Sequence, residues 1–360
     1  MLRARALRMF AVGGPALLAL LALTPALPIR SWRTGRLPAR ALPYTLTAPR
    51  DRPGSGRVWI DADAACGTGA RTDVDDCLAI WALARSKRVE IVGLSTVFGN
   101  APVDITDRTT RELVARLESW RGPRPGVFRG AGEPLAAAAR PNDAQRAMEA
   151  ALGHGPLTLV ALGPLTNVAE VLRAQPEMGS QIAEVVAVMG RREGHLFHPS
   201  EGNGRGSYLG HGPVFRDFNF CVDPEAVRIV LRSQVRLTLI PYDAATRCEV
   251  TAADLDRLAR RDEAGAWISA RSRRWLAFWH SSIGREGFFP FDLIGASYIT
   301  QPTHFRCARV TGWVGADETR PMADLWPEAL LIGDPEGTPS VSASVLTCSP
   351  TGSIDWTGPQ

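Results

Sequence analysis

The chain has 360 residues, of which 45% are hydrophobic, so it is long enough to bury a large core in one or two domains. Its formal net charge of +4 is unevenly distributed, because residues 1–50 contain eight arginines and no aspartate, glutamate or lysine. Without those eight, 33 of the 41 basic residues remain against 37 acidic ones. This balance excludes a general surface for nucleic-acid polymers, which requires a basic face. Lys87 is the single lysine, which leaves almost no candidate for a Schiff-base or P-loop lysine.

The first 29 residues have the pattern of a targeting segment. Three arginines precede an apolar run from Met9 to Ile29, whose proline-free centre is Ala16–Thr24. The run is short for a membrane span, which favours a signal peptide over an uncleaved N-terminal membrane anchor, the alternative. We therefore expect export, with the folded domain periplasmic or otherwise extracytoplasmic. Residues 30–56, rich in Pro, Arg, Gly and Ser, are interpreted as a linker.

From residue 57 onward, short apolar runs alternate with stretches of helical spacing. Strands are predicted at residues 58–60, 89–98, 126–130, 157–162, 182–189 and 235–240, with late strands at 310–314, 329–332 and 341–347. Helices are predicted at 77–84, 103–120, 143–152, 167–172, 224–231 and within 251–283. This order predicts an α/β domain over residues 57–350, with a mostly parallel, Rossmann-like central sheet flanked by helices. Residues 351–360 are then a C-terminal tail.

Five aspartates gather where the first predicted strand ends and the first helix begins. Asp61 and Asp63 follow the strand, and Asp73, Asp75 and Asp76 precede the helix. Ligands of open α/β sheets bind at the carboxyl ends of strands, and carboxylates this close stay ionised together only with a compensating cation. Oxygen-only ligands favour Ca²⁺ or Mg²⁺ over Zn²⁺. The alternative is a solvated acidic loop in which one aspartate caps the helix.

The six cysteines form no C-x-x-C pair and have no zinc-like spacing with histidine. Disulfides are compatible with export, but the sequence does not assign their pairing. Cys77, Cys221 and Cys348 lie in apolar contexts and are interpreted as small core residues. Cys66, in the acidic loop, is the one candidate for chemistry, but an ordinary structural role is the favoured interpretation there as well.

Several motifs together resemble the inosine/uridine-preferring nucleoside hydrolase family, over roughly residues 57–310. The motifs occur in the family's order: Asp61-Ala-Asp63 with Asp75-Asp76, Thr96-Val-Phe-Gly-Asn100, Val160-Ala-Leu-Gly-Pro-Leu-Thr-Asn167, Val188-Met-Gly190, Asp217-Phe-Asn219, Asp223-Pro-Glu-Ala226 and Asp292. The resemblance implies the nucleoside hydrolase fold and hydrolysis of the N-glycosidic bond of ribonucleosides to ribose and free base. It also implies a small-molecule nucleoside as substrate, a tightly bound Ca²⁺ and a homo-oligomer, either a dimer or a tetramer.

The resemblance also implies roles for individual residues. The Ca²⁺ ligands would be the carboxylates of Asp63, Asp76 and Asp292 and the main-chain carbonyl of Leu162, and Asp63 would also be the general base that activates the metal-bound water. Four other residues would bind the ribose hydroxyls or the metal ligands: Asp75, Asn100, Asn219 and, near the 5′ side of the sugar, Asp217. Asp61 would support the ligands from behind.

Four residues of these motifs also have a simpler interpretation. Asn167 and Asp223 fit helix caps, and Asp223 followed by Pro224 is a strong helix start. Asn100 could close a turn after its strand, and Asp292 could cap the helix that follows it.

Three departures from the family pattern bear on substrate identity. Eleven residues separate Asp63 from Asp75, about eight more than usual, which could move Asp75 and Asp76 away from the site. Phe291 stands where many members have the histidine that protonates the leaving base, so another acid such as His280, or stacking alone, would have to serve. The segment 191–215, with six glycines, is also longer than its family counterpart. Its three histidines are interpreted as solvated loop residues rather than metal ligands: His195, His198 and His211.

A non-catalytic ribose- or nucleoside-binding protein that retains the calcium site is the alternative function, supported by the missing histidine. A phosphotransferase of the Asp-x-Asp kind is disfavoured because the chain lacks a late lysine. A Ser-His-Asp hydrolase is disfavoured because no G-x-S-x-G motif occurs.

Overall fold

The computed structural model describes residues 45–46, 56–69, 72–118, 120–135, 141–192, 217–316, 328–352 and 354–356. The predicted signal peptide or anchor, most of the predicted linker and the three loop histidines lie outside these ranges. Within the described part of the chain, no helix combines the length and the apolar character that a membrane span requires.

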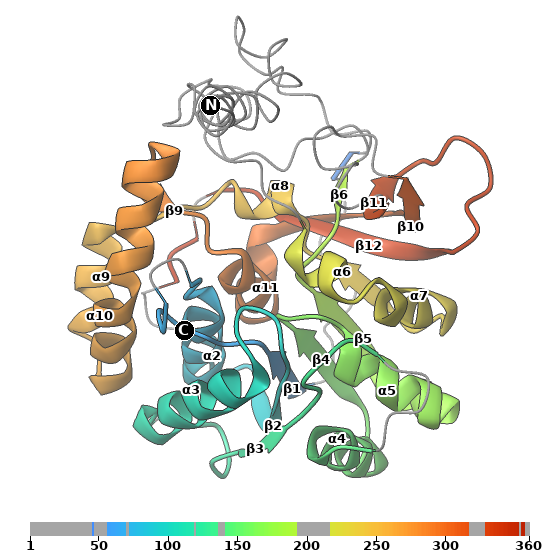
Figure 1. Cartoon of the computed structure of the whole chain (residues 1–360), viewed down its shortest axis with the longest axis horizontal. Helices are drawn as coiled ribbons and strands as arrows, with labels where there is room; N and C mark the ends of the chain where they lie inside the picture. Colours follow the sequence, from blue (N-terminus) through green and yellow to red (C-terminus); the bar gives the residue numbers. More distant parts are fainter. Residues whose placement is uncertain are drawn as a thin grey trace, which may run out of the picture.

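A ten-stranded sheet forms the centre of the domain, in the order β3-β2-β1-β4-β5-β7-β12-β10-β11-β6 (Figure 1). Its strands are β1 (Arg57–Ala62), β2 (Glu90–Thr96), β3 (Gly126–Arg129), β4 (Leu157–Ala161), β5 (Ile182–Ala187), β6 (Arg191–Arg192), β7 (Leu237–Leu239), β10 (Phe305–Ala316), β11 (Glu328–Gly333) and β12 (Ser342–Pro350). Neighbours pair in parallel except where β10 runs antiparallel to β11 and β12. The predicted α/β fold with a mostly parallel sheet is therefore confirmed.

Helices cover both faces of the sheet, as alternating strand residues require. On β1, Val58 and Ile60 belong to one hydrophobic cluster, and Trp59 between them belongs to the cluster on the other face. The first cluster is covered by α2 (Asp75–Arg85), α3 (Val103–Arg116), α9 (Ala252–Ala259), α10 (Glu263–Phe278) and α11 (Phe291–Thr300). The second is covered by α4 (Asp143–Gly153), α5 (Thr166–Ala174) and α7 (Pro224–Arg232), on the opposite side in Figure 1.

The strand order reverses between β1 and β4. From β1 the chain adds β2 and then β3 on one side, whereas β4, β5 and β7 follow on the other side. A reversal of this kind opens a crevice at the carboxyl ends of the two central strands, where α/β proteins bind ligands. Asp61 lies at the end of β1, and Leu162 directly follows β4.

Three elements differ from the prediction. The helical stretch 251–283 is divided into α9 and α10, because the Asp262 side chain accepts a hydrogen bond from the Gly265 amide and starts a new helix. A π-helical turn at Trp279–Ile283 then follows α10. A short helix, α6 (Phe218–Val222), follows Asp217, and β10 extends well beyond the predicted residues 310–314.

Cys77 and Cys348 are buried in the core, as predicted, but each of them belongs to a disulfide, which the sequence did not assign. Cys66 and Cys77 form a disulfide, and so do Cys307 and Cys348, which lie opposite each other on β10 and β12. All four side chains are buried, so apolar surroundings did not distinguish a thiol from a half-cystine. Cys221, in α6, is only partly buried.

The predicted C-terminal tail contributes to the core. Trp356 packs edge to face against Trp81 of α2, with ring centroids 6.3 Å apart, and Ile354 is buried in the same cluster. The start of this segment therefore packs against the helix that carries Asp75 and Asp76.

Candidate metal and substrate site

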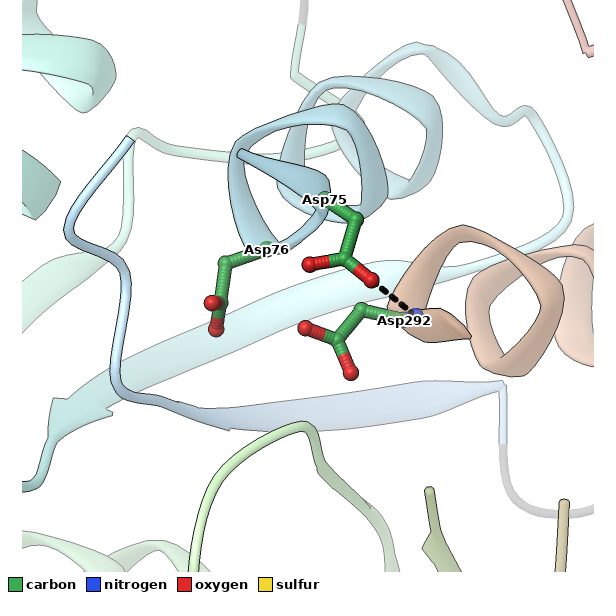
Figure 2. Close-up of side chains that lie close together, drawn as sticks. All are labelled: Asp75, Asp76 and Asp292. Carbon is green, nitrogen blue, oxygen red and sulfur yellow. Dashed lines mark hydrogen bonds between the residues drawn. The ribbon is translucent and has the colours of Figure 1, made fainter. Parts of the chain in front are cut away.

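Three buried carboxylates converge beside the carboxyl end of β1. Asp75 and Asp76 form the first turn of α2, and Asp292 lies in the first turn of α11, about 215 residues further along the chain. One oxygen of each lies within 4.8 Å of the others (Figure 2). The main-chain N–H of Asp292 donates a 2.9 Å hydrogen bond to Asp75 Oδ2, which fixes the two helix starts together. The long loop before α2 therefore does not carry Asp75 and Asp76 away.

Asp63 joins this group through Asn100. The Asn100 side-chain amide donates to Asp63 Oδ1 at 3.1 Å and to Asp76 Oδ2 at 3.2 Å, and its main-chain N–H donates to Asp63 Oδ2 at 2.8 Å. Asn100 therefore does more than close a turn. Gly99 and Gly163 pack against the same carboxylate, and a Cβ on Gly99 would lie 1.9 Å from Asp63 Oδ2.

Asp61 faces a different set of groups. Its Oδ1 accepts hydrogen bonds from Ser95 Oγ at 2.6 Å and from the Asn167 amide at 2.7 Å. Asn167 also donates to the Thr96 carbonyl and accepts from the Ala131 N–H. Asn167 lies inside α5, after the N-cap Leu165, so its interpretation as a helix cap is wrong. The amide instead ties the ends of β1, β2 and β3 together.

The electrostatics of the cluster call for a compensating positive charge. Burial, opposed by the Asn100 N–H, raises the pKa of Asp63 to about 7. Burial first, and then the neighbouring carboxylates, raises the pKa values of Asp76 and Asp292 well above their ordinary range. Asp76 Oδ1 is buried without a hydrogen-bond donor among the described residues. An unsatisfied oxygen within an all-oxygen donor set fits a hard cation such as Ca²⁺ or Mg²⁺.

Leu162 and Asn219 meet at the carboxyl end of β4, the strand next to β1. The Asn219 amide donates to the Leu162 carbonyl at 2.7 Å and to the Val188 carbonyl at 3.0 Å, which joins the ends of β4 and β5. A carbonyl oxygen has a second lone pair, so Leu162 keeps one acceptor position for another partner.

Asp217 caps α6 through a bond from the Phe220 N–H, and it accepts a 2.7 Å bond from the Gly190 N–H. Burial raises its pKa to about 6.

Phe291, directly before Asp292, belongs to an aromatic cluster. Its ring stacks on Tyr242 with centroids 5.6 Å apart, and it meets Phe289 edge to face at 6.4 Å. Asp292 lies within α11, whose N-cap is Pro290, so the interpretation of Asp292 as the cap is wrong. His280 is exposed on the π-helical turn after α10.

Asp223 is a helix cap, as predicted. Its Oδ1 accepts from the Ala226 N–H in the first turn of α7. Its Oδ2 accepts from Thr166 Oγ1 at 2.6 Å and from the Leu135 N–H at 2.9 Å, which joins α7 to α5 and to the segment after β3. These last two contacts cross long sequence distances and carry no local signal.

A cluster of buried carboxylates at the reversal of strand order gives this α/β protein a candidate metal site at the carboxyl edge of its sheet. The chain matches the model of the inosine-uridine preferring nucleoside hydrolase family over residues 58–330, and it belongs to that family. It is 26% identical over 266 residues to a non-specific ribonucleoside hydrolase, RihC, of Salmonella typhimurium, covering 64% of this chain and 77% of the relative. A pyrimidine-specific ribonucleoside hydrolase, RihA, of Photobacterium profundum is 28% identical over 164 residues, covering 45% of this chain and 47% of the relative.

Solved structures of the family share the fold. A plant nucleoside hydrolase, PpNRh1, superposes with a TM-score of 0.60 at 18% identity, covering 82% of this chain and 94% of the other. The inosine-uridine preferring nucleoside hydrolase of Bacillus anthracis superposes with a TM-score of 0.60 at 14% identity, covering 84% and 96%. At these identities the likeness concerns the fold.

Proposed function

We propose that this chain hydrolyses the N-glycosidic bond of ribonucleosides, or of a related N-riboside, to ribose and free base. The observation that carries the proposal is the Asn100 amide, which joins Asp63 to Asp76 beside Asp75 and Asp292. Family membership supports the same reaction, since the curated relatives are named ribonucleoside hydrolases.

The cation site would consist of Asp63, Asp76, Asp292 and the carbonyl of Leu162. This set supplies only oxygen ligands, as Ca²⁺ prefers, and leaves positions for the vicinal hydroxyls of a ribose and a water. When bound, the ion would orient the sugar and acidify that water. The hydrogen bond from Asn219 supports this assignment because it holds the Leu162 carbonyl in one orientation.

Asp63 is the proposed general base. A carboxylate beside the cation's water can accept its proton, and Asn100 fixes the Asp63 carboxylate next to Asp76. The two Asn100 bonds hold the carboxylate at the end of its strand while it accepts the proton of the attacking water. Asp61 accepts hydrogen bonds from Ser95 and Asn167 and would hold the end of β1, and so the position of Asp63, without contacting the cation itself.

The other polar residues would bind the sugar. Asp75 and Asn219 are proposed to hydrogen-bond the ribose hydroxyls, and Asp217 to lie near the 5′ side. Cleavage passes through an oxocarbenium-like state, so surrounding carboxylates stabilise the positive charge that develops on the ring.

The leaving base would not be protonated by a histidine next to Asp292, because Phe291 occupies that position in this chain. Phe291 offers an aromatic face and no proton. Its stack on Tyr242 holds that aromatic face beside Asp292, where it would favour bases able to leave without a strong acid. The alternative function, a non-catalytic binding protein, is not favoured, because Asp63 is buried beside the other carboxylates and oriented by two hydrogen bonds from Asn100, as a general base requires.

The decisive experiment compares Asp63→Asn with Asp104→Asn, a matched change of an exposed carboxylate on α3. The purified variants are incubated with a panel of purine and pyrimidine ribonucleosides, and liberated base and ribose are measured by chromatography. Loss of a general base should slow base release by about 10²–10⁴-fold in the first variant and leave the control unchanged. Equal turnover by wild type and Asp63→Asn would refute the assignment, and saturable binding without any base release by wild type would establish the binding-protein alternative.

Export of the folded domain is part of the same proposal. The two disulfides support it, since such bonds persist mainly in oxidising compartments. A homo-oligomer, dimer or tetramer, is also proposed by family membership, and light scattering on the full chain would test it.

A further inference from the structure

A disulfide lies inside the lengthened loop that connects the two halves of the carboxylate cluster. Cys66 follows Asp63 by three residues, and Cys77 directly follows Asp76. Both half-cystines are buried in the hydrophobic cluster under α2, with Cα atoms 6.1 Å apart. The bond therefore joins the end of β1 to the first turn of α2 by a path much shorter than the loop itself.

Hydrogen bonds within the loop stabilise its turns, in addition to the buried side chains of Ala64, Ala65 and Val74. Within its described residues, the Thr68 N–H donates to the Ala65 carbonyl at 3.1 Å and the Thr72 N–H to the Gly69 carbonyl at 3.5 Å. Asp73 Oδ1 accepts from the adjacent N–H groups of Val74 and Asp75. None of these bonds links the loop to β1.

The start of the loop is tightly constrained where the disulfide begins. Cys66 has a φ of 39°, which is uncommon for a residue other than glycine, and Gly67 has a φ of 68°. A Cβ on Gly67 would lie 2.4 Å from the Arg271 carbonyl of α10. The chain therefore turns sharply at the disulfide, and Gly67 packs closely against α10.

We propose that the Cys66–Cys77 disulfide positions Asp75 and Asp76 against Asp63, and that its reduction weakens the cation site. The inference rests on the proposed function for the identity of the cation. The bond adds a covalent link to the hydrogen bonds that Asn100 and Asp292 make to these carboxylates, across a connection of eleven residues between Asp63 and Asp75. Reduction by a dithiol transfers two electrons and two protons, giving two cysteine thiols and the oxidised, cyclic form of the reagent.

The second disulfide provides a matched control. Cys307 and Cys348 are also buried, but they join opposite residues of β10 and β12. β12 is separated from β1 by β4, β5 and β7, and neighbouring strands of a sheet lie about 4.8 Å apart. A pair of alanines there removes a buried disulfide and leaves the carboxylate cluster untouched.

The test measures Ca²⁺ binding by calorimetry and amide hydrogen exchange on the metal-free protein. Cys66→Ala/Cys77→Ala should weaken Ca²⁺ binding at least about tenfold and speed exchange across residues 64–76, while the rest of the chain keeps its protection. Cys307→Ala/Cys348→Ala should change Ca²⁺ affinity less than about twofold. Unchanged Ca²⁺ affinity and unchanged exchange in the first variant would overturn the proposal.

A second measurement avoids mutation at the site. In the Cys307→Ala/Cys348→Ala background, dithiothreitol should weaken Ca²⁺ binding as the Cys66–Cys77 bond opens, and reoxidation should restore it. No change in affinity upon complete reduction, measured by thiol titration, would also overturn the proposal. If wild type binds no Ca²⁺, the proposed cation site fails, whereas hydrogen exchange at residues 64–76 still decides whether the disulfide positions the helix start.

Discussion

The Asp63 carboxylate occupies space that two glycines leave open. Replacing Gly99 with alanine would place a Cβ 1.9 Å from Asp63 Oδ2, and the φ of 153° at Gly99 disfavours any side chain. Because Asn100 follows directly, the displacement would also disturb both hydrogen bonds that orient Asp63. Gly99→Ala should therefore lower kcat/KM for nucleoside hydrolysis by about 10²-fold, as misplacement of a catalytic group by about 1 Å does.

The control for this variant is Gly352→Ala, where a Cβ meets no atom within 4 Å. Steady-state kinetics on both variants, with circular dichroism to verify folding, distinguish local displacement from general damage. Activity in Gly99→Ala equal to that of Gly352→Ala would show that the carboxylate tolerates the new methyl group.

The sequence predicts the positions of some site residues better than those of others. Asp63 and Asp76 are predictable because each adjoins a strand or helix whose own pattern is local. The convergence with Asp292 was predicted from the family resemblance, and the structure brings it beside Asp75. The role of Asn167 was not predictable, because its partners Asp61 and Ala131 lie 106 and 36 residues away.

Helix starts are the features that most clearly link local sequence to the wider structure. Asp223 caps α7, as its position before Pro224 predicts, but it also accepts bonds from Thr166 and the segment after β3. Thr251 caps α9 in a capping box whose contacts stay within the helix start. A local cap such as Thr251 contributes about 1 kcal/mol to stability. Loss of the Asp223 side chain would also leave the buried Thr166 hydroxyl and the partly buried Leu135 N–H without their acceptor.

We therefore expect Asp223→Ala to reduce the free energy of unfolding by about 2–4 kcal/mol and Thr251→Ala by about 1 kcal/mol. Urea denaturation followed by circular dichroism measures both. Equal losses in the two variants would show that the long-range bonds of Asp223 add nothing to its cap.

Elements with a local signal were predicted well, and those defined by distant partners were not. The helix and strand pattern from β1 to β5 follows from apolar periodicity alone. The boundary between α9 and α10 depends on a single cap at Asp262, whose carboxylate also pairs with Arg85 at 2.8 Å. The length of β10 depends on its antiparallel partners β11 and β12, which the spacing of apolar residues does not reveal.

At the scale of the molecule, the sheet brings together segments that are far apart in the chain. The strand order reverses between β1 and β4, and α11 returns after more than 200 residues to complete the carboxylate cluster beside β1. The two disulfides stabilise different parts of this arrangement, one at the acidic loop and the other between two late strands. Pairing of cysteines is a property of the folded chain, so it required the structure.

Concentrating so many buried carboxylates makes the stability of the whole protein depend on pH and on the cation. The pKa of Asp63 rises from an ordinary value near 3.8 to about 7, because burial disfavours the charged form. A carboxyl with a raised pKa binds its proton more tightly in the folded state, so its contribution to stability is complete below about pH 4 and is lost as the pH rises through about 7. Burial shifts Asp76 and Asp292 in the same direction, and Asp217, raised to about 6, adds to the effect.

Metal-free protein should therefore unfold at a lower temperature at about pH 8 than at about pH 5, with a difference of a few kcal/mol in unfolding free energy. Saturating Ca²⁺ should act in the opposite sense, because the ion binds the ionised carboxylates and releases protons. Its stabilising effect should be small near pH 5 and large near pH 8, where it offsets the repulsion within the cluster. Differential scanning calorimetry of dialysed protein, with and without Ca²⁺, measures both trends. A melting temperature of the metal-free protein that rises from pH 5 to pH 8 would contradict the raised pKa values, and a Ca²⁺ effect independent of pH would contradict binding at these carboxylates.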